Sequence, residues 1–474
     1  MIATNARSVE CSQEKNLTSA VTENQPTLDL GIDLSTWSFL QGLCGLFDFP
    51  DNPDSSFKSE PLWNSQDQQQ LDAVQVRIDE VLRELELYIS RTKPQALNQS
   101  CPITPEMRKS LTVSTLDSLI RAYFDYATLH TPIIGRSCFN IHTTSSHLLL
   151  AIIATGGQLL PSVDSTFSSS EFFELVQDFI FDQAPLRNPH SCGLSKSPLS
   201  HETLEILQAA LIMLCTEVAT RSNPISHSTC ISRFLKLVSA IRGFSLTKVR
   251  RYDSFTGDEY DFDSSINISS TWKRFLKDEA MIRVAWMAFL LDIQFVLFFR
   301  TPPRFTITEM TGDLPCPDEL FTNTPDRSQM EIPSRSTHEC PALSLSSLIN
   351  LLMQPSSSDS SHFSSLNARG LFGGICGLHS IIFSAQTTHS IPYMRQVLER
   401  ALDRWRILWD ELQSRSDEAQ LEMLGFMKHA LEFWVLAKTL LRADPSVLKI
   451  ENVDMPSKGH LYNIYKEIGN IPLA

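Results

Sequence analysis

The strongest constraint on the fold is a spacing of three and four residues between apolar side chains, which recurs in segment after segment from about residue 114 onward. This spacing places the side chains on one face of a helix, so each segment predicts an amphipathic α-helix. Only Phe305–Ile307 alternates in the way that a strand does. Glycine is also scarce, with 17 residues in 474, which disfavours β-sandwiches and glycine-rich cofactor folds. The sequence therefore predicts an all-α fold, a large bundle of roughly ten or eleven helices.

The longest predicted helix runs from Trp272 to about Phe299 and ends before the Pro302-Pro303 pair. Its second half, 284–299, is a sixteen-residue run that is apolar apart from Asp292 and Gln294. A bilayer requires about 20 apolar residues, so we interpret this run as a buried core helix and not as a membrane span. Asp292 must then find a partner, because an unpaired buried carboxylate is costly.

The first 65 residues are polar and rich in turn-forming residues, which predicts a flexible region with one exception. Segment 28–57 interleaves large apolar side chains with aspartates and contains no Lys or Arg. The charges keep such a segment open while its apolar groups remain available to a partner's groove, as in acidic transcriptional activation segments. The alternative is a short helix docked on the protein's own core. The candidate activation residues are Trp37, Phe39, Leu43, Phe47 and Phe49.

Residues 66–91 carry a heptad-like seam over about three heptads, with charged residues on the other faces. The pattern predicts either a coiled coil, and hence a homodimer, or an amphipathic helix packed on the chain's own core. The seam residues are Leu71, Val74, Ile78, Val81 and Leu85. Residues 92–113, with three prolines, read as a linker, and 114–474 as the helical domain.

A search for catalytic, cofactor and metal motifs finds none, which predicts that the chain is not an enzyme and holds no cofactor or metal. No two of the ten cysteines lie closer than fifteen residues, so zinc-type spacing is absent. The formal net charge is −14, whereas domains that neutralise phosphates are usually basic. The densest basic run, 248–251, is interpreted as solvated surface. The first 25 residues hold no apolar run of the kind that a secretory signal needs.

The central helix and the turn after it resemble the fungal-specific transcription factor domain. The matching positions are Trp272, Glu279, Arg283, Trp286, Phe289, Asp292, Pro303, Leu314 and Pro315. Glu279 and Arg283 are four residues apart and can pair on one helix face. Three upstream blocks also match the family in order and spacing: 119–134, 148–156 and 205–214. Together the four blocks cover about residues 115–320.

The resemblance implies an all-helical regulatory domain, a nuclear location and an activator of a specific pathway, such as a secondary-metabolite gene cluster. Family members usually carry a zinc module that reads DNA, but only Cys11, Cys44 and Cys101 precede residue 115 here. We therefore expect the chain to act through a DNA-binding partner or the transcription machinery, or to be part of a longer protein. Two alternatives stay open: a scaffold or ligand-sensing module, and an all-α enzyme built around Glu279, Arg283 and Asp292.

Overall fold

The computed structural model describes residues 60–63, 66–92, 105–160, 166–188, 199–220, 224–251, 265–322, 343–355, 363, 365–416 and 424–442. Over these residues the fold is helical, and its β structure is limited to one isolated antiparallel bridge between Asp313 and Ser344. The all-α prediction is confirmed. The candidate activation segment 28–57 lies outside the described residues.

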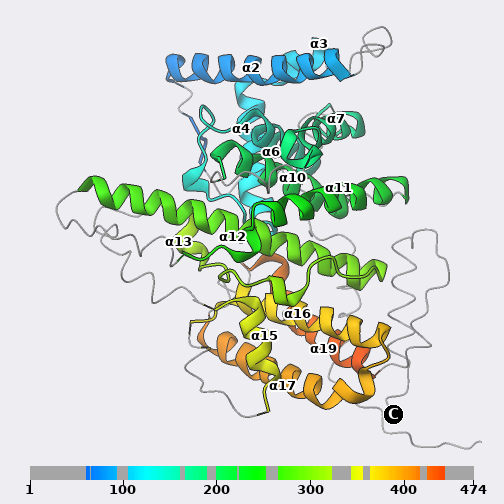
Figure 1. The fold of residues 1–474 in the computed structure, drawn as a ribbon. Helices are drawn as coiled ribbons and strands as arrows, with labels where there is room; N and C mark the ends of the chain where they lie inside the picture. The colour runs from blue at the N-terminus through cyan, green and yellow to red at the C-terminus, as the bar shows by residue number, and fades with distance from the viewer. Residues whose placement is uncertain are drawn as a thin grey trace, which may run out of the picture.

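The N-terminal half forms layers of helices at the upper end of the molecule (Figure 1). Side chains at the helix starts help to set these boundaries: Ser145 accepts from the Leu148 amide before α6, and Ser169 accepts from the Phe172 amide before α7. The helices are α2 (Gln68–Thr92), α3 (Pro105–Ser110), α4 (Val113–Ala122), η2 (Tyr123–Ala127), α5 (Thr128–His130), η3 (Arg136–Cys138), α6 (Ser146–Leu159), α7 (Ser170–Phe181), α8 (Ala184–Arg187), α10 (His201–Thr220), α11 (Pro224–Gly243) and η4 (Leu246–Lys248).

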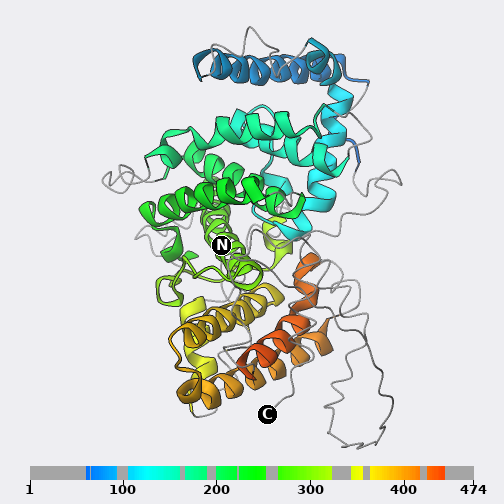
Figure 2. The ribbon, with the colours of Figure 1, turned by 90° about the vertical axis from the view of Figure 1, so that its right-hand side faces the viewer.

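Helix α12 (Ser265–Phe299) crosses the middle of the molecule, and the C-terminal helices lie below it in both views (Figures 1 and 2). These later elements are η6 (Ile307–Glu309), α13 (Asp318–Thr322), α15 (Leu345–Met353), α16 (Ala368–Thr387), α17 (Ile391–Arg415), η8 (Gly425–His429) and α19 (Ala430–Arg442). Of the described helices, those with nine or more residues are α2, α4, α6, α7, α10, α11, α12, α15, α16, α17 and α19. The predicted number of roughly ten or eleven agrees with this set.

Helix α12 begins at Ser265, seven residues before the predicted start at Trp272. The longer helix also changes the argument that the apolar run 284–299 is too short to cross a bilayer. By length and composition alone α10, α16 and the 272–297 part of α12 could each cross a bilayer, so the shortness of the apolar run does not exclude a span. In the fold, most residues of all three helices are buried, which accounts for their apolar character as core.

The Gly156-Gly157 pair lies inside α6, although glycine is common at helix ends. A Cβ atom on Gly156 would lie 2.3 Å from the Leu119 carbonyl oxygen of α4. A Cβ on Gly157 would lie 2.4 Å from the Phe167 carbonyl oxygen. The glycines therefore serve close backbone packing, and they do not end the helix.

The seam on α2 faces the chain's own core. Val74, Ile78, Val81 and Leu85 are buried, and Leu71 is partly buried. The helix contacts α4 and α6, and the Tyr88 ring packs against Phe179 of α7 at 5.3 Å. This corrects the prediction of self-association through the seam, because one chain already covers it.

Two predicted irregular or extended segments have other structures. Part of the 92–113 linker is helix α3, from which Met107 is buried in the core, and Leu111 just after it is also buried. The Phe305–Ile307 segment is not a strand: Phe305 lies in a bend, and Ile307 begins the 3₁₀ helix η6. A capping box explains the turn, since the Thr306 side chain and Glu309 satisfy each other's backbone amides.

Candidate functional site

Glu279 and Arg283 lie on α12 where it meets both halves of the molecule. The four-residue spacing brings their side chains together, and Arg283 Nε donates to Glu279 Oε1 at 2.6 Å. The same oxygen accepts the Cys316 backbone N–H at 2.9 Å. Arg251 Nη1 donates to the other oxygen, Oε2, at 2.5 Å. Glu279 is fully buried, and both carboxylate oxygens have charged partners.

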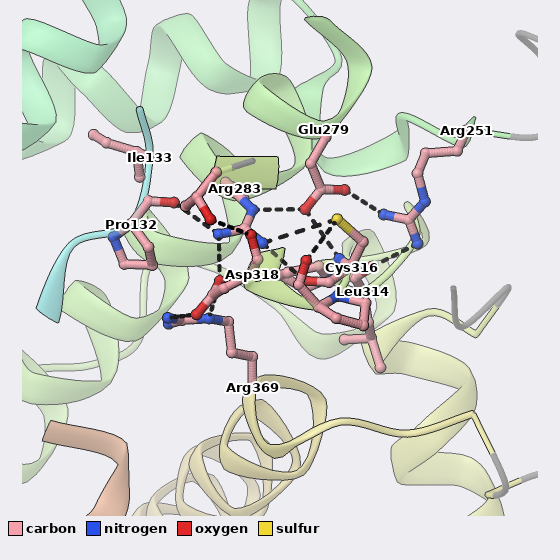
Figure 3. A network of polar contacts seen from close by, with 12 residues as sticks. Pro132, Ile133, Arg251, Glu279, Arg283, Leu314, Cys316, Asp318 and Arg369 are labelled. Carbon is pink, nitrogen blue, oxygen red and sulfur yellow. Dashed lines mark hydrogen bonds and ion pairs between the residues drawn. The ribbon is translucent and has the colours of Figure 1, made fainter. Parts of the chain in front are cut away.

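Arg283 is also fully buried, and its guanidinium group is saturated with acceptors (Figure 3). Besides Glu279, Nη1 donates to the Pro132 carbonyl oxygen at 3.1 Å and to Asp318 Oδ1 at 2.8 Å. Nη2 donates to the Cys316 carbonyl oxygen at 2.8 Å, with the Cys316 sulfur at 3.9 Å. Its carbon lies 4.2 Å from the centre of the Phe321 ring. All five N–H groups of the guanidinium are therefore used inside the protein.

Asp318, the first residue of α13, bridges α12 to the C-terminal helices. Besides Arg283, it accepts from Arg369 of α16, whose Nε lies 2.8 Å from Oδ1 and whose Nη2 bonds Oδ2. Burial alone would raise the pKa of the Asp318 carboxyl, but the guanidinium groups of Arg369 and Arg283 outweigh it and hold that pKa well below its usual range. Asp318 is therefore ionised in the folded protein.

Arg251 is the fifth member of a connected group of charged residues, which we call the junction network: Arg251, Glu279, Arg283, Asp318 and Arg369. Its Nη2 donates to the Leu314 carbonyl oxygen at 2.8 Å, and its backbone N–H donates to Asp313 Oδ2 at 2.9 Å. With Asp313 included, three guanidinium groups face three carboxyl groups. A buried ionic cluster needs equal numbers of positive and negative groups, because each charge that is removed from water needs a partner of opposite sign.

Asp292 lies apart from this network. It is thirteen residues beyond Glu279, which is about 20 Å along a helix axis. Its Oδ2 accepts the backbone N–H groups of Arg304 at 2.7 Å and Phe305 at 2.8 Å. The carboxylate therefore ties the chain just after Pro303 back onto α12. Burial raises the pKa of Asp292 to about 6, although these two N–H groups and the Arg304 side chain oppose that rise.

Trp272 and Trp286, which are two of the positions that carry the family resemblance, pack against neighbouring side chains. Trp272 stacks on Phe275, with ring centres 5.1 Å apart. Trp286 is buried and lines a cavity of about 20 Å³ beside Ile282 and Asp313. A cavity of this volume has room for about one water molecule and none for a substrate. Within the described residues, no group of His, Cys, Asp and Glu side chains could hold a metal ion.

Comparison with known proteins identifies the family of the chain. The sequence matches the family described as "Fungal specific transcription factor domain" over residues 120–407. The chain belongs to this family. The match includes Glu279, Arg283, Asp318 and Arg369, and it extends beyond the 115–320 blocks that carried the resemblance. In this member of the fungal-specific transcription factor domain family, Glu279 and Arg283 of the central helix form the centre of a buried ionic junction.

The chain is also similar to transcription factor verF of Penicillium polonicum, with 22% identity over 327 residues. The alignment covers 64% of this chain but only 44% of that protein, so the chain spans less than half of its relative's length. No solved structure shows significant similarity.

Sequence reasoning missed three of the five network residues. Arg251 belongs to the basic run that was interpreted as solvated surface, yet it is almost completely buried. Asp318 and Arg369 belong to none of the apolar stripes or family blocks found in the sequence. The signal available for Arg369 was a charge in an otherwise apolar helix, since the 20-residue helix α16 contains no other Asp, Glu, Lys or Arg.

Proposed function

We propose that this chain is a nuclear regulator of transcription, whose helical domain serves as a platform for other proteins. Its membership of a family defined by a transcription factor domain, over 120–407, is the observation that carries the proposal. The similarity to a protein named as a transcription factor supports it. By the family resemblance, the targets are the genes of one pathway, with a secondary-metabolite gene cluster as the first expectation.

The same proposal excludes turnover at the central helix. The groups that an enzyme site would need there are used up: Arg283 donates all its N–H groups to protein atoms, and both Glu279 oxygens are paired. Asp292, the third candidate, is about 20 Å away along the helix. The cavity beside α12 has room for about one water molecule. These features support a structural role for the residues.

Recruitment to promoters is proposed to depend on a DNA-binding partner. The 474 residues contain no cysteine pair closer than fifteen residues, and the net charge of −14 opposes binding to a phosphate backbone. A membrane is not among the expected partners, because the three helices of the described part of the chain that are apolar enough to span one are mostly buried in the fold.

The test of the regulatory role is transcript profiling of a deletion strain. We expect a small set of genes, grouped in one pathway, to lose expression and to recover when the intact chain is restored. Chromatin occupancy of the tagged chain, measured with and without candidate DNA-binding partners, then separates indirect from direct recruitment. Unchanged transcripts in the deletion strain would overturn the proposal and favour a scaffold or ligand-sensing module.

Segment 28–57 is the proposed activation segment, and a fusion to a foreign DNA-binding domain tests it separately. We expect the fusion to raise reporter output. A variant with Trp37, Phe39, Leu43, Phe47 and Phe49 changed to Ala keeps every aspartate and should be inactive. Equal output from both fusions would show that the charge, and not the apolar side chains, carries any effect. A silent intact fusion would remove the segment from the proposal while leaving the family role intact.

A further inference from the structure

The turn between α11 and η4 exposes a serine hydroxyl. Ser245 is the residue before η4, its side chain is exposed, and it makes no hydrogen bond to the start of that helix. Its backbone φ is +57°, in the left-handed region. Glycine adopts this region most readily, and asparagine, aspartate and histidine are the side chains that are enriched there. The backbone conformation therefore does not account for a serine at this position.

Three exposed cations border this turn. Arg242 lies three residues before Ser245, Lys248 lies three residues after it, and Arg250 lies five residues after it. The chain folds tightly here, because the Ser245 backbone N–H donates to the Arg242 carbonyl oxygen and the Lys248 N–H donates to the Ser245 carbonyl oxygen, both at 3.0 Å. The long side chains of Arg242 and Lys248 can therefore reach an anion attached to the Ser245 hydroxyl.

We propose that Ser245 is a phosphorylation site, modified by a protein kinase that selects an arginine three residues before the acceptor serine. Arg242 holds that position, and charge patterns of this kind decide which substrates a kinase accepts. In the reaction Ser245 Oγ attacks the γ-phosphorus of ATP, and a new O–P bond forms. The bond from that phosphorus to the bridging oxygen breaks, ADP leaves, and the catalytic aspartate of the kinase accepts the hydroxyl proton. Phosphoserine carries a charge of about −1.5 to −2 at pH 7, which the bordering cations stabilise.

Arg242 also links α11 to the segment that follows α12. Its Nε and Nη2 each donate to a carboxylate oxygen of Glu309 at 2.8 Å, and Nη2 also donates to the Arg304 carbonyl oxygen. The Glu309 oxygen that Nη2 binds also accepts the Thr306 backbone N–H at 2.7 Å. Arg242 therefore fastens segment 304–309 to the end of α11.

A phosphate on Ser245 competes with Glu309 for Arg242, because it carries more negative charge than a carboxylate. It also adds negative charge beside the carbonyl oxygens at the end of α11, where an anion is unfavourable. Both effects weaken the Arg242–Glu309 pair. Asp292 holds the same segment to α12 by two backbone hydrogen bonds, so phosphorylation loosens the segment at one of its attachments and leaves another in place.

Incubation of the full chain with ATP and calcium/calmodulin-dependent protein kinase II, a kinase with this arginine requirement, tests the site. Site-resolved mass spectrometry should find phosphate on Ser245, and Ser245→Ala should lose it. The matched control is Ser239→Ala. Ser239 has Lys236 three residues before it, but its hydroxyl donates to the Leu235 carbonyl oxygen inside α11, so this variant should be phosphorylated at Ser245 as wild type is.

Hydrogen exchange of the phosphorylated chain measures the effect on segment 304–309. Its amides should exchange about tenfold faster than in the unmodified chain, because a hydrogen-bonded charge pair that holds them is weakened. Glu309→Gln without phosphate should show a similar acceleration, since it weakens the same pair, and circular dichroism must show that this variant stays folded. Ser245→Ala after the same kinase treatment corrects for phosphate on other serines and should exchange as the unmodified chain does.

These readouts do not depend on the proposed role in transcription. Three results would overturn the proposal. The first is a chain that the kinase leaves unmodified at Ser245. The second is a chain phosphorylated at Ser245 in which segment 304–309 exchanges at the unmodified rate. The third is equal acceleration in the kinase-treated Ser245→Ala chain, which would assign the effect to another serine.

Discussion

At the scale of single residues, the junction network shows why a buried charge is tolerated in an apolar core. Arg283 has no contact with solvent, yet its pKa is raised above the ordinary arginine value, because the charges of Asp318 and Glu279 outweigh the effect of burial. The side chain is therefore always a cation, and its energetic contribution depends on its partners remaining in place.

Removing this cation should be strongly destabilising. Arg283→Met keeps much of the side-chain volume but leaves Glu279 and Asp318 with one cation fewer. We expect a loss of about 3–5 kcal/mol in the free energy of unfolding, because breaking a buried pair leaves an uncompensated charge. Urea unfolding followed by circular dichroism measures it.

The matched control for that experiment is Arg108→Met, which breaks an exposed ion pair with Glu86. Exposed pairs contribute about 0–1 kcal/mol, so this variant should unfold close to wild type. Similar losses from both substitutions would contradict a special role for the junction network.

The raised pKa of Asp292 predicts that the stability contributed by this carboxyl increases as the pH falls, whereas the contribution of a salt-bridged acid decreases. The pKa of Asp292 is raised to about 6, whereas an unfolded Asp titrates near about 3.9. Between these values the folded state binds the proton more readily, so this carboxyl stabilises the fold increasingly as the pH falls from 7 to 4. Relative to Asp292→Asn, wild type should therefore gain stability on acidification.

Measuring the free energy of unfolding of both proteins at several pH values isolates this effect, since titrating groups elsewhere, including Asp318, cancel in the difference. Parallel stability curves for wild type and Asp292→Asn would show that Asp292 does not titrate in this window.

At the scale of elements, the sequence pattern was most informative where one face of a helix packs. The α2 seam, the α12 core face and the stripes of the later helices are all set by periodicity, because a 3.6-residue turn places their apolar residues together. Element ends were less predictable. Helix α12 extends seven residues further toward the N-terminus than its apolar stripe, and α6 continues through two glycines.

The glycines of α6 allow a direct test at this scale. Gly156→Ala would place a Cβ atom 2.3 Å from a backbone oxygen of α4, which cannot move without moving that helix. We expect a loss of about 1–3 kcal/mol or more from overpacking, even though Ala favours helices. The melting temperature is the readout.

Gly370→Ala on α16 serves as the control, since its new Cβ would meet the ends of two leucine side chains at 3.2 Å and 3.3 Å and the Asn367 side-chain oxygen at 3.5 Å, and no backbone atom among its three nearest neighbours. Flexible side chains can adjust, and the gain in helix propensity remains. An unchanged melting temperature for Gly156→Ala would mean that α4 and α6 are not held in close backbone contact.

At the scale of the whole molecule, a few polar contacts join helices that are distant in sequence. Arg369 of α16 binds Asp318 at the start of α13, and His130 Nδ1 of α5 accepts the Phe426 backbone N–H of η8 at 3.1 Å. The first contact ties α16 through Asp318 to Arg283 of α12, and the second ties η8 to the N-terminal layers. The C-terminal helices that lie below α12 in Figure 2 are thus held to the rest of the molecule by polar contacts as well as by apolar packing.

We therefore expect the two halves not to fold alone. Fragments 1–322 and 343–474, expressed separately, should lack a cooperative thermal transition, since each exposes one side of the junction network and the apolar surface around it. Mixing them should restore a transition. Circular dichroism melts of each fragment and of the mixture measure this, and a cooperative melt of either fragment alone would show two independent domains.

The sequence by itself determined the all-helical class, the central helix and the family resemblance, because side-chain periodicity and short-range spacing such as that of Glu279 and Arg283 are local properties of the chain. Only the tertiary structure decided which charges meet and which faces are covered. Arg251 and Asp318 bind the charges of α12, and Arg369 joins them through Asp318, from segments that no periodicity relates. The α2 seam is largely buried because α4 and α6 of the same chain pack against it. Burial and ion pairing depend on distances in space, which a one-dimensional pattern does not contain.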